Sequence, residues 1–162
     1  MRFLLLGFLC VLAACGFQPV HGTRTASGTV SQAFQSMSIS NIPDREGQIL
    51  RNNLVDRLHL RGTPKKANYA LTVSPLSTRV VRLGIAADAS TTRAQYEVHT
   101  DVILKDARSD EVLLEQQFRG IAAFNILGSE FQTVVTEEDA RNRVLNDIAA
   151  QIETRLSLYF NR

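Results

Sequence analysis

The chain has 162 residues, of which 18 are Lys or Arg and 16 are Asp or Glu, so its formal net charge is +2. This near balance excludes the strongly basic surface with which nucleic-acid-binding proteins neutralise phosphates. The length allows one domain with a modest hydrophobic core.

The first fourteen residues have the pattern of an export signal. Met1 and Arg2 give a positive start, the apolar run extends from Phe3 to Leu12, and small residues precede Cys15. An uncut membrane anchor is disfavoured, because spanning a bilayer takes about 20 helical residues. An ordinary signal peptide with a chance cysteine is the other alternative. We predict a signal peptide over residues 1–14.

The sequence Leu-Ala-Ala-Cys that ends at Cys15 resembles the lipobox of bacterial lipoproteins, in which the cysteine sulfur receives a diacylglycerol. The only other cysteine, Cys10, lies in the discarded segment, so the mature chain cannot form an internal disulfide. Two or more acyl chains are enough for stable membrane anchoring. We therefore predict a lipid anchor on Cys15.

Residues 15–35 are predicted to form a lipidated tether, and residues 36–162 a single domain. The segment from Gly16 to Gln35 is rich in Gly, Ser, Thr and Gln and has little periodicity, which favours an extended conformation. The alternation from Met37 to Ile42 predicts a first strand, and Pro43 ends it.

A helix is predicted from about Arg45 to Arg61, with Asp44 as its N-cap. Leucines recur every four residues in this segment and give it one apolar face. Gly62 is placed to end the helix with a left-handed backbone conformation, and Pro64 prevents its continuation.

From Asn68 onward the period changes to two, which predicts strands up to Pro75 and from Arg79 to Ala86. After a turn at residues 87–90, a long strand extends to Lys105. Its alternation places one set of residues on a covered face: Ala94, Tyr96, Val98, Thr100, Val102 and Leu104. The opposite set is polar: Arg93, Gln95, Glu97, His99, Asp101 and Lys105. One covered and one solvated face are typical of an antiparallel sheet.

The end of the chain is predicted as a hairpin followed by a helix. Residues 106–110 form the turn, and the return strand runs from Glu111 to about Asn125. A loop with an exposed Phe131 follows over residues 127–135, and Thr136 to Asp139 resembles a capping box. The final helix has an apolar stripe that extends from Ala140 to Tyr159.

This order predicts an α+β fold. We expect a two-layer sandwich in which a four-stranded, mixed but mostly antiparallel sheet has two helices packed on one face, in the order β-α-β-β-β-α. The first helix should connect two parallel strands.

No residue pattern indicates catalysis, a cofactor or a metal. His21, His59 and His99 lack paired ligand spacing and are interpreted as solvated polar residues. The chain has no Gly-x-Ser-x-Gly and no glycine-rich phosphate loop after a strand. The carboxylates of residues 137–139 are interpreted as serving the dipole of a helix N-terminus. We therefore predict that the chain is not an enzyme.

Three arginines are candidates for phosphate binding. Arg79, Arg82 and Arg93 flank a hinge between strands, and with Lys65 and Lys66 they could form a basic end. Solubilising a sheet rim is the alternative, and strand parity puts Arg79 and Arg82 on opposite faces. The apolar residues of the predicted loop leave two readings open, a partner surface or a cap on the core: Leu127, Phe131, Val134 and Val135.

The segment Cys-Gly-Phe-Gln-Pro from Cys15 to Pro19 resembles the start of mature lipopolysaccharide-assembly lipoproteins of the LptE family, although His21 stands where the family has an aromatic residue. The Arg-Glu-x-Gln-Ile-Leu-Arg-Asn-x-Leu helix from Arg45 to Leu54 and the Ala-rich final helix are also similar to the family. The resemblance implies a lipoprotein of the Gram-negative outer membrane that plugs the LptD β-barrel and assists lipopolysaccharide delivery to the outer leaflet.

Two functions remain open on these observations. The first is a non-enzymatic plug and assembly factor for LptD, lipid-anchored to the outer membrane and lying in the barrel lumen or facing the periplasm. The second is a periplasm-facing lipoprotein that binds a small or lipid ligand and belongs to no barrel complex. In the first, Arg79, Arg82 and Arg93 are the candidate contacts for lipopolysaccharide phosphates.

Overall fold

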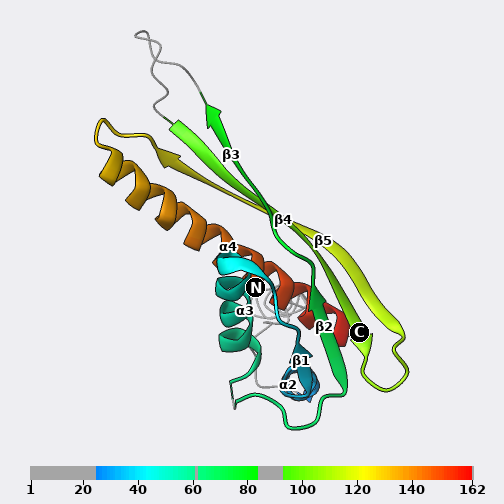
Figure 1. The fold of residues 1–162 in the computed structure, drawn as a ribbon. Coiled ribbons are helices and arrows are strands. Elements are labelled where there is room, and N and C mark those ends of the chain that lie inside the picture. Colours follow the sequence, from blue (N-terminus) through cyan, green and yellow to red (C-terminus); the bar gives the residue numbers. More distant parts are fainter. Residues whose placement is uncertain (1–24, 61, 84–92, 162) are drawn as a thin grey trace, which may run out of the picture.

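The computed structural model describes residues 25–60, 62–83 and 93–161 (Figure 1). The predicted signal peptide, Cys15, the first part of the tether and the turn at residues 87–90 lie outside these residues. The elements are α2 (Thr25–Gln35), β1 (Met37–Ile39), α3 (Asp44–Leu58), β2 (Tyr69–Val73), β3 (Ser77–Leu83), β4 (Arg93–Asp106), β5 (Val112–Asn125) and α4 (Glu130–Phe160).

The sheet is built around β4. Strand β5 runs antiparallel along one side of β4, whereas β2 and β3 both run antiparallel along its other side. Strand β1 lies parallel to β2, so α3 connects two parallel strands as predicted. The predicted α+β class with a mixed, mostly antiparallel sheet and helices on one face is confirmed (Figure 1).

The sheet has five strands rather than four, because one edge of β4 is shared by two short strands. Val73 is the last residue of β2 and pairs with Val102, while Ser77 begins β3 and pairs with His99. Pro75 lies between them and has no N–H to donate to the ladder. Between the two strands the chain stays attached to β4, because the N–H of Ser74 donates to the carbonyl of Asp101 at 2.9 Å.

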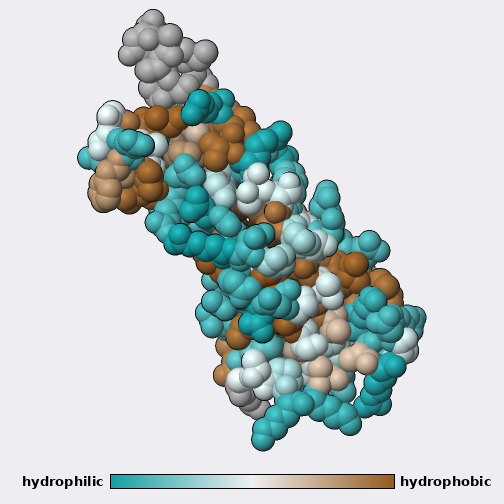
Figure 2. All heavy atoms as spheres, in the orientation of Figure 1, coloured by the Kyte–Doolittle hydropathy of each residue, from teal (hydrophilic) through white to brown (hydrophobic). Residues whose placement is uncertain are grey.

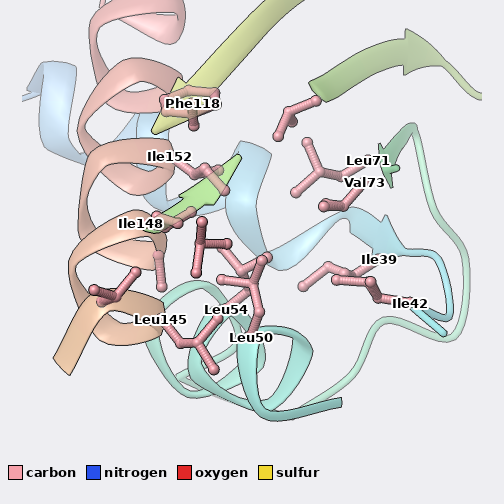
Figure 3. Packing of buried hydrophobic residues seen from close by; sticks show 14 of the residues in the cluster. Ile39, Ile42, Leu50, Leu54, Leu71, Val73, Phe118, Leu145, Ile148 and Ile152 are labelled. Atoms are coloured by element: carbon pink, nitrogen blue, oxygen red, sulfur yellow. The ribbon is translucent and has the colours of Figure 1, made fainter. Parts of the chain in front are cut away.

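The hydrophobic core lies between the sheet and the helices. Alternate residues of β4 from Ala94 to Leu104 are buried, as the alternation predicted. Figure 3 shows Leu50 and Leu54 of α3 and Ile148 and Ile152 of α4 directed into the same cluster as β-strand side chains. Gly120 of β5 lies so close to α4 that a Cβ there would be 2.9 Å from Val144.

The structure has a third helix, α2, in the segment that was predicted to be extended. Phe34 is buried, and its ring lies 6.4 Å from that of Phe160 at the end of α4. The carbonyl of Ser36 accepts hydrogen bonds from the N–H groups of Asn68 and Tyr69. Tertiary packing therefore holds as a helix a segment whose composition alone does not favour one.

Helix α3 follows the prediction with shifted ends. It begins at Asp44, which has a φ of +65°, and Pro43 occupies the N-cap position, so the predicted capping role of Asp44 is wrong. The regular helix ends at Leu58, three residues before the predicted end. Gly62 has the predicted left-handed conformation, with a φ of +92°, but the C-cap is His59, so Gly62 does not end the helix as predicted; it donates its N–H to the carbonyl of His59 in the turn that follows.

The hairpin between β4 and β5 is confirmed at residues 106–110. Asp106 accepts hydrogen bonds from the N–H groups of Arg108 and Ser109 at 2.8 and 3.0 Å. The bond from Ser109 and, to a smaller extent, the bond from Arg108 lower the pKa of Asp106 from its ordinary value. Lys105 pairs with Asp110 across the turn.

Candidate functional site

One face of the sheet has no helix packed on it in the part of the chain that the structure describes (Figure 1). We call it the open face, and the strand register places the following polar residues there: Thr72, Arg79, Arg93, Gln95, Glu97, His99, Asp101, Gln117 and Arg119. Strand β4 alone has fourteen residues, so at about 3.3 Å per residue this face is roughly 45 Å long. Apolar residues share this face, among them Ile103 and Ile121, which pairs in register with Glu97, so it offers a partner a long surface that is mainly but not wholly polar.

The centre of the open face is an ion-pair cluster around Glu97. Its carboxylate accepts from Arg79 on β3 at 2.7 Å and lies 3.5 Å from Arg119 on β5. His99 Nε2 lies 3.9 Å from the same carboxylate. The two arginines cover Glu97, whose side chain is only 6% exposed although it belongs to the predicted solvated set.

The electrostatics of the cluster follow from this arrangement. The hydrogen bond from Arg79, with the charges of Arg79 and Arg119, lowers the pKa of Glu97 against the opposing effect of burial. Glu97 is therefore ionised at neutral pH. Since two exposed guanidinium groups surround one carboxylate, the cluster has a net positive charge.

The strand register does not bring the three predicted phosphate-binding arginines together. Arg79 is paired with Glu97 in the middle of the sheet. Arg82 pairs in register with Ala94, which is buried under α4, so Arg82 lies on the helix side, while Arg93 lies on the open face. Arg82 and Arg93 are exposed at the same end of the sheet, and neither has an ion-pair partner among the described residues.

The predicted basic end that included Lys65 and Lys66 is wrong. These lysines precede β2, whose first residue pairs with Asp106. Arg82 and Arg93 instead lie where β3 ends and β4 begins. The lysines and these two arginines are therefore at opposite ends of the sheet.

Sequence reasoning missed Arg119. On β5 it is opposite His99 and diagonal to Glu97, a relation that depends on the register between the two strands. Counting back from the hairpin turn at residues 106–110 could have paired them, but the irregularity between Leu104 and Lys105 shifts that count by one residue.

An exposed apolar surface lies at the end of the molecule where α4 begins. We call it the apolar tip and define it by four residues with their exposed fractions: Leu127 at 41%, Phe131 at 76%, Val134 at 57% and Val135 at 49%. Figure 2 shows hydrophobic surface gathered in this region. Of the two readings left open, the exposure favours a contact surface over a cap on the core.

The start of α4 differs from the prediction. Residues 130–135 were expected to be a loop, but they are helical, and Ser129 is the N-cap. The predicted capping box is wrong, because Thr136 lies inside the helix and donates to the carbonyl of Asn125 at 2.9 Å. The apolar tip is therefore carried on a helix and a short connection.

The carboxylates of residues 137–139 do not lie at a helix N-terminus, so their predicted dipole role is wrong. Each forms an ion pair: Glu137 with Arg141, Glu138 with Arg45 and Asp139 with Arg143. Partial burial acts to lower the pKa of Arg141, but its hydrogen bond to Tyr96 and its neighbouring carboxylates raise that pKa overall. The Glu138–Arg45 pair links α4 to α3, the other two pairs lie within α4, and the hydrogen bond from Arg141 to Tyr96 links α4 to the sheet.

The histidines do not converge. His59 is buried, contrary to the prediction, and its Nε2 lies 2.8 Å from the carbonyl oxygen of Met37, while His99 lies on the open face. His21 lies outside the described residues.

In the described ranges no group of three or more histidine, cysteine and acidic residues could hold a metal ion. In the same ranges no helix combines the length and the apolar character that crossing a membrane requires.

One family model and several solved structures match this chain. The model of a family described as LptE, Lipopolysaccharide-assembly, matches residues 34–156. No protein with a curated description matches the sequence.

Several solved structures have the same fold. A candidate lipoprotein from Caulobacter crescentus has a TM-score of 0.67 at 22% identity, over 83% of this chain and 97% of that one. A minor lipoprotein from Acinetobacter baumannii has a TM-score of 0.63 at 17% identity, over 77% and 92%. The rare lipoprotein B from Shewanella oneidensis has a TM-score of 0.59 at 11% identity, over 76% and 92%.

Proposed function

This chain belongs to the LptE family of lipopolysaccharide-assembly proteins, and from that membership we propose that it forms a complex with an outer-membrane β-barrel of the LptD type. In this complex it is a plug and assembly factor, not an enzyme, and it assists lipopolysaccharide delivery to the outer leaflet. The family assigns the chain to lipopolysaccharide assembly, and the barrel partner is the step that we add.

The observation that carries this proposal is the open face. No helix of the described residues packs on this side of the sheet, and the charged cluster of Arg79, Glu97 and Arg119 at its centre suits contact with a polar surface. The interior of an outer-membrane barrel is polar, whereas its outer wall is apolar. The open face therefore fits the lumen wall of a barrel.

Contacts with lipopolysaccharide are assigned to the end of the sheet that carries the apolar tip. Arg82 and Arg93 lie there without ion-pair partners in the described part of the chain. Arginine binds phosphate through two parallel hydrogen bonds, and apolar side chains next to it suit acyl chains. Arg79 is a weaker candidate, because Glu97 already engages it at 2.7 Å.

The proposed anchor is a lipid on Cys15, which holds the protein on the outer membrane after the signal peptide of residues 1–14 is removed. Cys15→Ala should abolish labelling with radioactive palmitate and block normal processing of the precursor. Cys10→Ala is the control and should leave both unchanged, because Cys10 lies within the signal peptide. Unchanged labelling of Cys15→Ala would refute the anchor.

The barrel complex is tested by photocrosslinking in intact cells. A photoreactive residue at His99, which is partly exposed on the open face, should crosslink to an outer-membrane β-barrel protein. Asp147 on the exposed side of α4 is the control position and should give little of this product. If His99 gives none while the barrel is present in the same membranes, the plug proposal is wrong.

The phosphate contacts are tested by charge reversal. Replacing Arg79, Arg82 and Arg93 together by Glu should weaken lipopolysaccharide binding, and the loss should be largest at low salt. The same reversal at Lys65 and Lys66 is the control, because these residues lie at the other end of the sheet. Equal binding by the two variants would assign the arginines to solubility.

A further inference from the structure

The outer edge of β5 is unusual for a sheet in solution. This strand has fourteen residues and pairs only with β4 in the described part of the chain, so its other edge is free. A free edge exposes alternate N–H and C=O groups that can pair with another strand, and proteins normally protect such edges.

Helix α4 protects the second half of the edge. Side chains from α4 donate hydrogen bonds to three β5 carbonyls: Thr136 to Asn125 at 2.9 Å, Arg143 to Ala123 at 3.2 Å and Gln151 to Arg119 at 3.4 Å. These carbonyls belong to alternate, odd-numbered positions, which is the pattern of groups that point away from β4.

The first half of the edge lacks this protection. By the same alternation the backbone groups of Glu115 and Gln117 point outward, and no side chain of the described residues binds them. The irregularity next to Leu104 lies further toward the hairpin and does not cover them. A short stretch of β5 is therefore available for strand pairing.

An open groove of about 620 Å³ runs beside this stretch. One wall is β5 from Gln116 to Arg119, and the other is the second half of α4, including Arg155 and Leu158. Two arginines line the groove, and no carboxylate does. Leu158 is 53% exposed, so the groove also offers an apolar surface.

The side chain of Arg155 indicates which chemical group a ligand in the groove would carry. Its Nε is buried and has no hydrogen-bond acceptor within the described residues. Arg57 and Arg141 of these helices are paired with Glu153 and Glu137, whereas the buried Nε of Arg51 on α3 lacks a partner in the described residues, as that of Arg155 does. A buried donor without an acceptor is costly, and a carboxylate is the acceptor that suits a guanidinium group best.

We propose that the groove beside β5 docks an extended segment of a partner protein, which adds a strand to the edge at Glu115–Gln117 and places a carboxylate side chain on Arg155. Backbone pairing supplies affinity in this mode of recognition, and the side-chain contacts supply specificity. The proposal does not depend on the barrel complex, because it concerns an edge and not the open face.

A second copy of this chain is the less suitable occupant. In a symmetric dimer the same patch meets itself, so Arg155 of one groove would face Arg155 of the other, whereas Arg119 is already paired with Glu97 on the open face. The groove lining contains no carboxylate to offset this repulsion. An acidic segment of another protein has the complementary charge.

The test is photocrosslinking of the full-length lipoprotein in its native envelope, with a photoreactive residue at Glu115, Gln116 or Gln117 in turn. Strand pairing predicts that the three positions crosslink to three consecutive residues of one partner segment, in order. That segment should contain an Asp or Glu. A synthetic peptide of the mapped segment should then bind the purified protein.

Substitutions at the groove separate docking from simple proximity. Arg155→Glu should lower the crosslink yield about tenfold, and Arg108→Glu, the same charge change in the exposed hairpin, should leave it unchanged. Leu158→Glu introduces a carboxylate at an exposed position and should also lower the yield, which covers the case in which Arg155→Glu does not fold.

Four outcomes would overturn the proposal: no crosslink, crosslinks scattered over a partner, products with lipid or with a second copy of this chain, or yields that neither groove variant changes. The crosslink from His99 reports separately on the barrel complex. Failure of one proposal is therefore distinguishable from failure of the other.

Discussion

The two ends of the sheet are covered to different extents. The end that contains β1 and β2 is covered by α3 and α4 together, whereas the end formed by β3 and the start of β4 has only α4 beside it (Figure 1). At the first end the leucines of α3 are completely buried, and at the second the apolar tip is exposed. The buried end therefore contributes most of the stability, and the exposed end is available for contacts with a partner.

The largest effect on stability is expected from Leu54→Ala in α3. Leu54 is fully buried in the cluster between α3, α4 and the sheet, so the substitution leaves a cavity and should lower the free energy of unfolding by about 2–5 kcal/mol. Leu60→Ala, at a position that is 79% exposed, should have little effect. Urea unfolding followed by circular dichroism measures both, and equal losses would show that the burial of Leu54 does not account for the stability of this end.

The next largest effect is expected where α4 crosses β5 between the two ends. Gly120→Ala would place a Cβ 2.9 Å from Val144 and 3.0 Å from Ile148, so α4 must shift away from the sheet. We expect a loss of about 1–3 kcal/mol in the free energy of unfolding. The control is Gly128→Ala, where a Cβ meets no atom within 4 Å. A neutral result at Gly120 would mean that the helix moves freely on the strand.

A smaller, pH-dependent effect is expected at Glu97. Because its pKa is lowered in the folded protein from the ordinary value of 4.5, its ion pairs stabilise the fold above that pH, and this contribution is lost as the pH falls through the folded pKa. Glu97→Gln should therefore be less stable than the parent at pH 7 and equal to it in acid. Glu115→Gln, which removes no ion pair seen among the described residues, should follow the parent at every pH. A difference for Glu97→Gln that does not change with pH would exclude this linkage.

Local periodicity predicted the strands and α3 better than it predicted α2 or the charged cluster of the open face. Residues that alternate between a dry and a wet environment, such as Ala94 and Gln95, have a period that local chemistry imposes, and the same holds for the leucine repeat of α3. Helix α2 could not be predicted, because its stability comes from distant contacts such as that between Phe34 and Phe160. The cluster of Arg79, Glu97 and Arg119 likewise depends on the register of three strands.

The apolar tip is the region where the sequence left two readings open, since exposed and buried apolar residues have the same local pattern. The exposure of Phe131 distinguishes them, and it also leads to the last prediction. Phe131→Ser should change the free energy of unfolding by no more than about 0.5 kcal/mol, because the ring is mostly exposed and is not part of the buried core. It should nevertheless weaken binding of lipopolysaccharide by roughly tenfold, in line with the loss of one buried aromatic side chain from a contact.

Unfolding in urea and binding of fluorescent lipopolysaccharide measure the two effects on the same preparation. Leu60→Ser is the matched control, because Leu60 is exposed to a similar extent but lies just after α3, away from the apolar tip. A loss of binding in both variants would show only that exposed apolar residues help non-specifically. A loss of stability in Phe131→Ser would instead mean that the first turns of α4 belong to the folding core, and the contrast between the two ends would disappear.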